Sequence, residues 1–512
     1  MRKWKRFLCI AASLCLAGLS ACGGEENSGL SLDEVKERQG SFSAGASVHD
    51  PSIYEENGTY YIFGSHMEAA KSEDLRNWKS FATGVSKNNP LFDNLFDEPR
   101  KAFEFVGRNE EGGYSVWAPD VIYNEKMGKY MMYFCTTSTY KRSTLCFATA
   151  DNPEGPYTFQ DTILHSGFTT ADAKNKEQIF GDVNFDMRKY MLTGDYNNLQ
   201  WPNALDPAVF YDENGKLWMV YGSWSGGIYL LELDEETGYP IFPEEDQENE
   251  VDSYYGRHLI GGMHQSCEGP YILYDEESGY YYLFVSYGGL TADGGYQIRL
   301  FRSENPDGPY VDANGENFGL NVEDHTEYGL KMMGNYTFPS LPYSYLSPGH
   351  NSAFMDEDGK LYLVYHQRFS DQGEVHEPRV HQMFRSQDGW LVAAPFATQG
   401  ETLREEGNSS KELAGTYYYV NHGTDISSEV HEAEELHLTS GGKIEDASGK
   451  NVGSFSTEEN SPYITLSIEE EEYQGVLVDM EDEAGNPVLC FTAAGESNQS
   501  VWGVKYLAQE ES

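Results

Sequence analysis

Five ionisable side chains stand at comparable points of the sequence, each at the entrance to a short strand-like run. Carboxyl groups that meet in space can perform general acid–base chemistry, because a protonated one donates a proton to a leaving group while an ionised one activates water. The same group could instead bind calcium, which prefers oxygen ligands, although a histidine fits poorly in an oxygen cage. The five residues are Asp50, Asp120, Asp206, Glu268 and His350.

A repeated hairpin pattern supplies the elements that would bring these residues together. After each residue the chain has a short apolar run, a polar turn that contains glycine, and an aromatic run. The turns suit tight β-hairpins, in which Asn or Gly supplies the positive φ. The aromatic runs are residues 59–65, 129–135, 216–224, 280–288 and 360–368.

The glycines of the five turns are 70, 87, 64 and 80 residues apart. This recurrence predicts an all-β fold with a five-bladed β-propeller over residues 44–400, whereas a β-sandwich would not account for it. Because the innermost strands of a propeller line a central channel, we expect the five ionisable groups to share one register at one mouth of that channel. A third carboxylate beside the acid would raise the pKa of the acid by like-charge repulsion.

Five motifs follow one another between about residues 45 and 400: HDPSI, WAPDVIY, NALDPAVFY, EGPYILY and GHNSAF. Together they resemble glycoside hydrolase family 43 and, within it, the extracellular endo-1,5-α-L-arabinanases. The resemblance implies a five-bladed β-propeller that hydrolyses α-1,5-linked L-arabinan with inversion. It makes Asp50 the general base, Glu268 the general acid, and Asp206 the carboxylate that orients the acid and adjusts its pKa. It also places His350 beside a metal ion, usually calcium, that is held largely by water molecules.

The same resemblance implies substrate contacts around the catalytic motifs. Trp224 could stack on an arabinose ring or pack within its blade, and His264 could line the cleft or lie on a surface loop. Asp120 could have a direct catalytic role or only satisfy backbone amides in the channel. The predicted contacts are Trp117, Asp120, Asn203, Ser223, Trp224, Ser225 and His264.

The N-terminus has the pattern of an export signal. Four basic residues within positions 2–6 precede a short apolar run over residues 7–19, which is too short to span a bilayer as a mature helix. The sequence Leu19-Ser20-Ala21-Cys22 resembles a bacterial lipobox, in which the cysteine is acylated after cleavage; an ordinary signal peptide with an incidental cysteine is the alternative. We therefore expect a signal peptide over residues 1–21, a surface tether over 22–43, and a lipid anchor at Cys22 as the sole membrane attachment.

Composition excludes nucleic acid as a partner but does not decide whether the cysteines form a disulfide. The chain has 512 residues with 83 Asp and Glu against 35 Lys and Arg, so its net charge of −48 excludes nucleic acid as a partner. Cys135 and Cys146 could pair across a hairpin or remain free, and strand alternation predicts Cys267 in a blade core. No cysteine spacing resembles a zinc site. We expect a monomer whose substrate is a neutral polysaccharide.

Residues 401–512 differ in composition from the rest, with 24 acidic and 5 basic residues. Short apolar runs alternate with turns there, which predicts a small antiparallel β-barrel without catalytic residues. Alternatives to the endo-arabinanase are an exo-acting α-L-arabinofuranosidase or β-xylosidase of the same family, and a non-catalytic glycan-binding lipoprotein. Xylosidases often carry a larger domain behind the propeller, and fructan-cleaving propellers lack the WAPD and EGP motifs.

Overall fold

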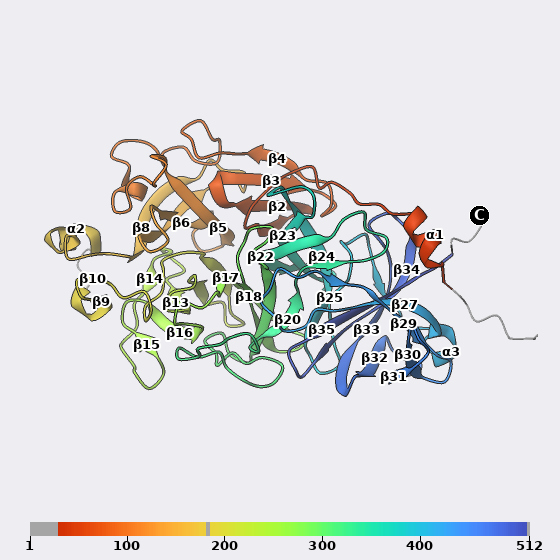
Figure 1. The fold of residues 1–512 in the computed structure, drawn as a ribbon. Coiled ribbons are helices and arrows are strands. Elements are labelled where there is room, and N and C mark those ends of the chain that lie inside the picture. The colour runs from red at the N-terminus through yellow and green to blue at the C-terminus, as the bar shows by residue number, and fades with distance from the viewer. Residues whose placement is uncertain (1–28, 181–184, 509–512) are drawn as a thin grey trace, which may run out of the picture.

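The computed structural model describes residues 29–180 and 185–508, which form five β-sheets around a channel and a β-barrel beside them (Figure 1). Blades 1 and 2 each contain four antiparallel strands in chain order. Blade 1 has β1 (Ser52–Glu56), β2 (Thr59–Gly64), β3 (Glu68–Ser72) and β4 (Lys79–Ala82); blade 2 has β5 (Ser115–Asn124), β6 (Lys129–Thr137), β7 (Ser143–Ala150) and β8 (Thr158–Ser166).

Blades 3 to 5 repeat this plan with additions at their edges. Blade 3 has β11 (Ala208–Tyr211), β12 (Leu217–Tyr221), β13 (Ile228–Leu233) and β16 (Gly256–Ile260), with β14 (Pro240–Ile241) and β15 (Val251–Asp252) at its edge. Blade 4 has β17 (Glu268–Asp275), β18 (Tyr280–Tyr287), β19 (Gln297–Ser303) and β20 (Leu330–Met333). Blade 5 has β22 (Tyr345–Met355), β23 (Leu361–Phe369), β24 (His376–Arg385) and β25 (Leu391–Ala393), extended by β21 (Tyr336–Thr337).

The first strand of each blade lies innermost, and these strands form a closed ring. β1 contacts β5, β5 contacts β11, β11 contacts β17, β17 contacts β22, and β22 returns to β1. At the closure, the Ser352 hydroxyl accepts a hydrogen bond from the amide of Ile53 (3.1 Å) and donates one to the carbonyl of Pro51 (2.8 Å). The predicted five-bladed propeller is confirmed, and the predicted aromatic runs are the second strands of the blades.

The segment that connects blades 2 and 3 contains a few short elements. They are the helix α2 (Lys176–Phe180) and the strands β9 (Met191–Leu192) and β10 (Asp195–Tyr196). The aromatic rings of Phe180, Phe185 and Tyr190 join the buried core that blades 2 and 3 share.

The C-terminal region closes into an eight-stranded barrel, because β33 pairs with both β32 and β34. Its strands are β27 (Gly415–Asn421), β29 (Glu434–Leu438), β30 (Lys443–Asp446), β31 (Asn451–Thr457), β32 (Tyr463–Ile468), β33 (Glu471–Glu481), β34 (Pro487–Gly495) and β35 (Ser500–Tyr506). The short β26 (Thr402–Leu403) adds to β33, the helix α3 (Ser410–Leu413) precedes β27, and β28 (His431–Glu432) pairs with β21 of blade 5.

The barrel and the propeller share one hydrophobic core. Tyr365 and Trp390 of blade 5 are buried in the same cluster as Val420, Val476 and Trp502 of the barrel. The indole nitrogen of Trp502 donates to the carbonyl of Ala393 (2.8 Å). The barrel therefore packs directly against blades 4 and 5, as Figure 1 shows.

Much of the predicted tether is folded onto the protein. The helix α1 (Leu32–Glu37) begins at a capping box formed by Ser31 and Glu34, and Val35, 1% exposed, enters the core shared by the barrel and blade 5. The amide of Leu30 donates to the carbonyl of Tyr506 (3.0 Å). The capping-box spacing and the apolar Leu30 and Val35 account for this order. The signal peptide and Cys22 lie outside the described residues.

The four cysteines of the described chain are free and buried. Cys135 faces the core between blades 2 and 3, whereas Cys146 faces the core between blades 1 and 2. They lie on opposite faces because Phe134, not Cys135, pairs with Cys146 in the β6–β7 register. Cys267 is in a blade core, as predicted. None of the described helices has the length and apolarity needed to cross a membrane.

Candidate active site

A residue with positive φ marks the entrance to each innermost strand and turns the chain into the channel. Four of these residues are followed by proline, and the ladder with the next strand is irregular in blades 2, 4 and 5. Such irregularities re-aim side chains. The five residues are Asp50 (φ 56°), Ala118 (40°), Asp206 (53°), Gly269 (56°) and His350 (47°).

The ionisable groups therefore do not share one register, and that expectation was wrong for two of them. Asp50, Asp206 and His350 occupy the strained position, whereas Glu268 lies one residue earlier and Asp120 two residues later. The offset leaves Glu268 half-buried and makes Asp120 a buried residue of the channel wall, 2% exposed. Residues from the entrances of all five innermost strands line one small cavity, and Asp50, Asp120, Asp206 and His350 are among them, whereas Glu268 is not.

Asp50 lies among histidines. Its Oδ2 is 2.8 Å from Nδ1 of His49, its Oδ1 is 3.2 Å from Nδ1 of His350, and the Ser65 hydroxyl donates to Oδ2. Burial alone would raise the pKa of Asp50, but His350 and His49 outweigh burial and hold the pKa well below its usual value. Asp50 is therefore a carboxylate at neutral pH, the form that a general base requires.

Asp206 has the opposite character. Burial raises its pKa to about 7, and the negative charges of Glu268 and Asp50 add to the rise although His350 opposes it. Its Oδ2 accepts a hydrogen bond from the amide of Gly269 (3.3 Å), which places the carboxyl group beside the backbone of Glu268. The mouth thus combines an ionised carboxylate with a carboxyl group that holds its proton up to near neutral pH. Two carboxyl groups with such different pKa values are typical of acid–base sites.

Glu268 is held by two hydroxyl groups. Ser223 donates to Oε2 (3.0 Å) and Tyr296 donates to Oε1 (2.9 Å). Glu268 begins β17 and is half-buried, so its carboxyl group stands at the rim of the channel. This combination of access and orientation suits a group that must reach a leaving oxygen.

His350 and Asn351 face the cavity from blade 5. Burial would lower the pKa of His350, but the charges of Asp50, Asp206 and Glu268 raise it. The side-chain oxygen and nitrogen of Asn351, which is 2% exposed, are buried and have no hydrogen-bond partner among the described residues. The cavity measures about 20 Å³, enough for one water molecule or ion, and Asp120 and Asp206 also line it.

Besides the cavity at His350, one cluster of three side chains in the described part of the chain has the spacing of metal ligands. His49, Asp50 and His366 each offer a ligand atom within 4.8 Å of the others. Two nitrogen ligands and one carboxylate suit a transition metal better than calcium. In this structure the two histidines hold Asp50 in place. The ring of His49 stacks on that of His366 (4.2 Å between centroids), and Nδ1 of His366 lies 3.3 Å from the backbone amide of Asp50.

Asp120 joins three blades. Its Oδ1 accepts from the Ser52 hydroxyl of blade 1, and its Oδ2 accepts from the amide of Val209 in blade 3 (2.6 Å). Burial raises the pKa of Asp120 to about 6. Of the two roles considered for Asp120, these contacts support the structural one, and the predicted substrate contact stays a prediction.

Asn203, Trp224, Ser225 and His264 lie near Ser223, the residue that donates to Glu268. The side-chain amide of Asn203 donates to the carbonyls of Tyr140 (2.7 Å) and Ser223 (3.2 Å). The rings of Trp224 and His264 lie 5.4 Å apart, and both residues are half-buried. Ser225 is buried beneath them, where its amide faces Nδ1 of His264 (3.3 Å). Trp117 packs partly against the core between blades 2 and 3. Their contact with a substrate stays a prediction.

Four residues of the site were missed from the sequence. Tyr296 touches Glu268, His49 and His366 surround Asp50, and Tyr140 lies 5.8 Å from His264 with its ring exposed. His49 directly precedes Asp50 in the HDP motif, which is a usable local sign. Tyr296 and His366 come from other strands or loops of their blades, and nothing adjacent to them in sequence indicates the contact.

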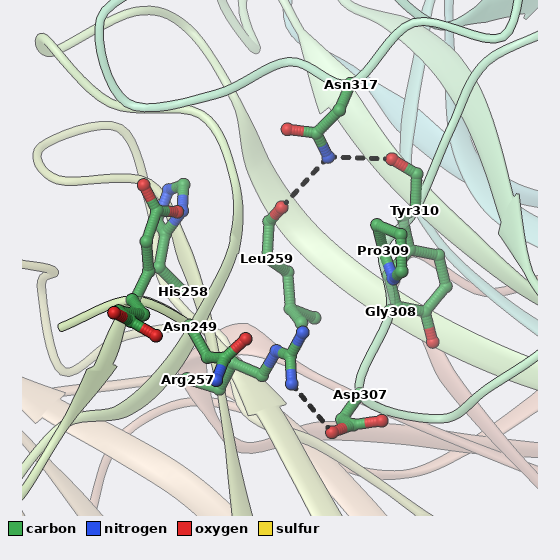
Figure 2. Close-up of a pocket in the computed structure, with 11 residues that line it drawn as sticks. Asn249, Arg257, His258, Leu259, Asp307, Gly308, Pro309, Tyr310 and Asn317 are labelled. Atoms are coloured by element: carbon green, nitrogen blue, oxygen red, sulfur yellow. Dashed lines mark hydrogen bonds and ion pairs between the residues drawn. The ribbon is translucent and has the colours of Figure 1, made fainter. Parts of the chain in front are cut away.

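A separate pocket of about 190 Å³ lies at the edge of blades 3 and 4 (Figure 2). Arg257 forms an ion pair with Asp307 (2.9 Å), and Asn317 donates to the carbonyls of Leu259 (3.3 Å) and Tyr310 (2.7 Å). Because these contacts join the protein to itself and no predicted catalytic residue lines the pocket, we place the active site at the channel mouth.

The chain matches two family models. The model of glycosyl hydrolases family 43 matches residues 44–199 and 168–391, and the model of a C-terminal lipocalin-like domain matches residues 395–503. Together they cover the propeller and the barrel.

Relatives of known activity align along most of the chain. The chain is 41% identical over 475 residues to the extracellular endo-α-(1→5)-L-arabinanase 2 of Bacillus subtilis, covering 90% of this chain and 93% of that protein. It is 39% identical over 477 residues to an extracellular endo-α-(1→5)-L-arabinanase of Thermotoga petrophila, covering 90% and 94%. The crystal structure of endo-1,5-α-L-arabinanase from Thermotoga petrophila RKU-1 matches with a TM-score of 0.79 at 38% identity, over 91% of this chain and 100% of that chain. A more distant relative, 27% identical over 359 residues, is an extracellular exo-α-(1→5)-L-arabinofuranosidase of Cellvibrio japonicus; 67% of this chain and 85% of that protein align.

Proposed function

Since this chain belongs to glycosyl hydrolases family 43, we propose that it is an exported endo-arabinanase that hydrolyses α-1,5-L-arabinofuranosidic bonds with inversion. The observation that carries the proposal is the pairing, in one channel mouth, of an ionised Asp50 with the Asp206–Glu268 pair, where Asp206 holds a proton near neutral pH. The similarity to two endo-arabinanases along 90% of the chain supports the substrate.

The residues divide the reaction between them. Asp50 accepts a proton from a water molecule while the oxygen of that water bonds to the anomeric carbon. Glu268 gives its proton to the leaving oxygen as the glycosidic bond breaks. Water enters on the face opposite the leaving group, so the configuration inverts. Asp206 orients Glu268 through the amide of Gly269.

The product pattern from linear α-1,5-arabinan tests this proposal. The wild type should release mixed oligosaccharides, with the β-anomer first by proton NMR. Asp50→Ala and Glu268→Ala should each lose at least about 100-fold in rate, whereas Glu357→Ala, at an exposed glutamate of a hairpin turn, should match the wild type. Arabinose as the sole product would establish exo action, xylose release from β-xylosides would establish a xylosidase, and equal activity of Glu268→Ala would contradict the mechanism.

We further propose a calcium ion at His350. The donor set fits, because the cavity beside His350 is lined by the carboxyl groups of Asp50 and Asp206 and by the side-chain amide of Asn351, whose oxygen and nitrogen have no hydrogen-bond partner among the described residues. When bound, the ion would supply a fixed positive charge beside the catalytic carboxylates. Calcium should raise the melting temperature of chelator-treated protein, and His350→Ala and Asn351→Ala should weaken calcium binding in calorimetry. An unchanged melting temperature with no heat of binding would contradict the site.

Lipid anchoring at Cys22 is a separate proposal. The apolar run and lipobox-like sequence support it, and extracellular relatives support export. The wild type should fractionate with membranes and incorporate labelled fatty acid, while Cys22→Ala should do neither. Recovery of both proteins in the medium would indicate an ordinary signal peptide.

A further inference from the structure

Blade 4 presents buried polar side chains whose partners lie in the C-terminal region. Gln297, Arg299 and Lys331 are each at most 1% exposed. The side-chain amide of Gln297 donates to the carbonyl of Asp425 (2.9 Å), and the guanidinium of Arg299 donates to the carbonyl of Thr424. The ammonium of Lys331 lies 2.9 Å from that same Asp425 carbonyl and 3.0 Å from its Oδ1. Because a buried polar group without a partner is costly, segment 424–428 is an integral part of blade 4.

The Asp425 side chain in turn fixes its own segment. Its Oδ1 also accepts from His431 (3.1 Å), and its Oδ2 accepts from the Ser427 hydroxyl (2.6 Å). One carboxylate thus ties Lys331 of the propeller to Ser427 and His431 of the C-terminal region. Removing this carboxylate would leave Lys331 with the Asp425 carbonyl as its one partner in this segment.

Segment 424–428 packs closely against a turn of blade 4 that contains Gly294 and Gly295. A Cβ added to Gly295, whose φ is +68°, would lie 2.3 Å from the carbonyl oxygen of Ser427, and one added to Gly294 would lie 2.1 Å from that of Gly289. The turn is therefore clamped between its own loop and the C-terminal region. Only glycine allows backbones to approach this closely.

Tyr296 follows this turn and reaches the active site. Its ring is buried against Gly349, where an added Cβ would lie 2.1 Å from the ring, and it stacks 5.7 Å from His366. Its hydroxyl donates to Oε1 of Glu268 (2.9 Å). A continuous line of contacts therefore runs from Ser427 through Gly295 and Tyr296 to Glu268.

We propose that segment 424–428 of the C-terminal region positions the general acid, by holding Gly295 so that Tyr296 orients Glu268. The inference rests on the proposed role of Glu268. Tyr296 and Asp425 are positioning residues: loosening either one impairs proton delivery to the leaving oxygen, while Asp50, held by His49, His350 and Ser65, still activates water.

Substrates with different leaving groups separate this role from general destabilisation. Asp425→Ala and its matched control Glu429→Ala, an exposed carboxylate in the same stretch, are compared on linear arabinan and on a 2,4-dinitrophenyl α-1,5-arabinotrioside. Dinitrophenolate leaves without protonation, so the second substrate does not need the acid. Tyr296→Phe is measured in parallel, because it removes only the hydroxyl and tests the contact even if Asp425→Ala does not fold.

We expect Asp425→Ala and Tyr296→Phe to lose at least about tenfold in kcat/KM on arabinan and to keep wild-type rates on the aryl substrate. Glu429→Ala should match the wild type on both substrates. Equal losses on both substrates, or no loss on arabinan, would overturn the inference. Glu268→Gln provides the reference: if it also loses equally on both substrates, the proposed role of Glu268 fails, whereas a selective loss there without one in Tyr296→Phe refutes the positioning alone.

Discussion

Replacing Asp120 by asparagine tests whether this channel carboxylate serves the scaffold. In the wild type, Asp120 accepts hydrogen bonds from Ser52 and from the amide of Val209. Asparagine has nearly the same shape; its oxygen can accept from Val209 and its amide group can donate to the Ser52 oxygen. The substitution therefore keeps both contacts between the blades and removes only the charge.

The charge should be costly to bury. The pKa of Asp120 is raised by burial to about 6 from an ordinary value of 3.8. A carboxyl group with a raised folded-state pKa loses its proton more readily when unfolded, so its contribution to stability falls as the pH rises from about 3.8 to about 6. The two pKa values give a destabilisation of about 1 kcal/mol at pH 4.5 and about 3 kcal/mol at pH 7.5. Asp120→Asn should remove it.

Thermal unfolding of the chelator-treated wild type, Asp120→Asn and Asp358→Asn between pH 4.5 and 7.5 measures this effect. The melting temperature of Asp120→Asn should exceed that of the wild type, and the gap should grow toward pH 7.5. Asp358→Asn, at an exposed turn, should show no pH-dependent gap. Activity on arabinan should be unchanged in both variants. A gap that is absent or equal at both pH values, or a loss of activity like that of Asp50→Ala, would refute the reasoning.

Three further predictions concern stability. Trp502→Ala should cost about 3–5 kcal/mol and lower one joint calorimetric transition, because Trp502 is buried in the core that both domains share; a barrel that melts alone would contradict the shared core. Val35→Asp should lower the melting temperature, whereas Lys36→Ala on the exposed side of α1 should not; equal values would show that α1 adds nothing. Burial lowers the pKa of His165 to about 3 and that of His381 to about 4. Their contribution to stability should therefore be complete above about pH 6.5 and fall as the pH drops toward 4, and a flat melting temperature over that range would contradict it.

The blades could be predicted from the sequence because their pattern is local. Each aromatic run follows a turn with an Asn or Gly, and the observed strands β2, β6, β12, β18 and β23 lie within or overlap the predicted ranges. Asp50, Asp206 and Glu268 could be identified because they stand next to strands that converge. The short motif around each one was sufficient to place it at the channel mouth.

The offsets and partners within the mouth could not be predicted in this way. One residue of register separates Glu268 from Asp206, and it decides which carboxyl group stands at the rim and which is buried beside the strand. Likewise, Cys135 and Cys146 looked able to pair, yet a one-residue shift in the β6–β7 register places them on opposite faces. Such details depend on how irregular turns enter the sheets.

By itself, the sequence determined the repeated hairpins, the closure into five blades, the C-terminal barrel and the place of Asp50, Asp206 and Glu268 next to innermost strands, since hydrophobic alternation and turn chemistry act between near neighbours. The tertiary structure alone decided the ionisation of those groups and their support. Asp50 is ionised in part because His350 of blade 5 lies beside it, Tyr296 reaches Glu268, and segment 424–428 packs closely against Gly295. These contacts join residues tens to hundreds of positions apart, and they exist only once the blades and the barrel have closed on one another.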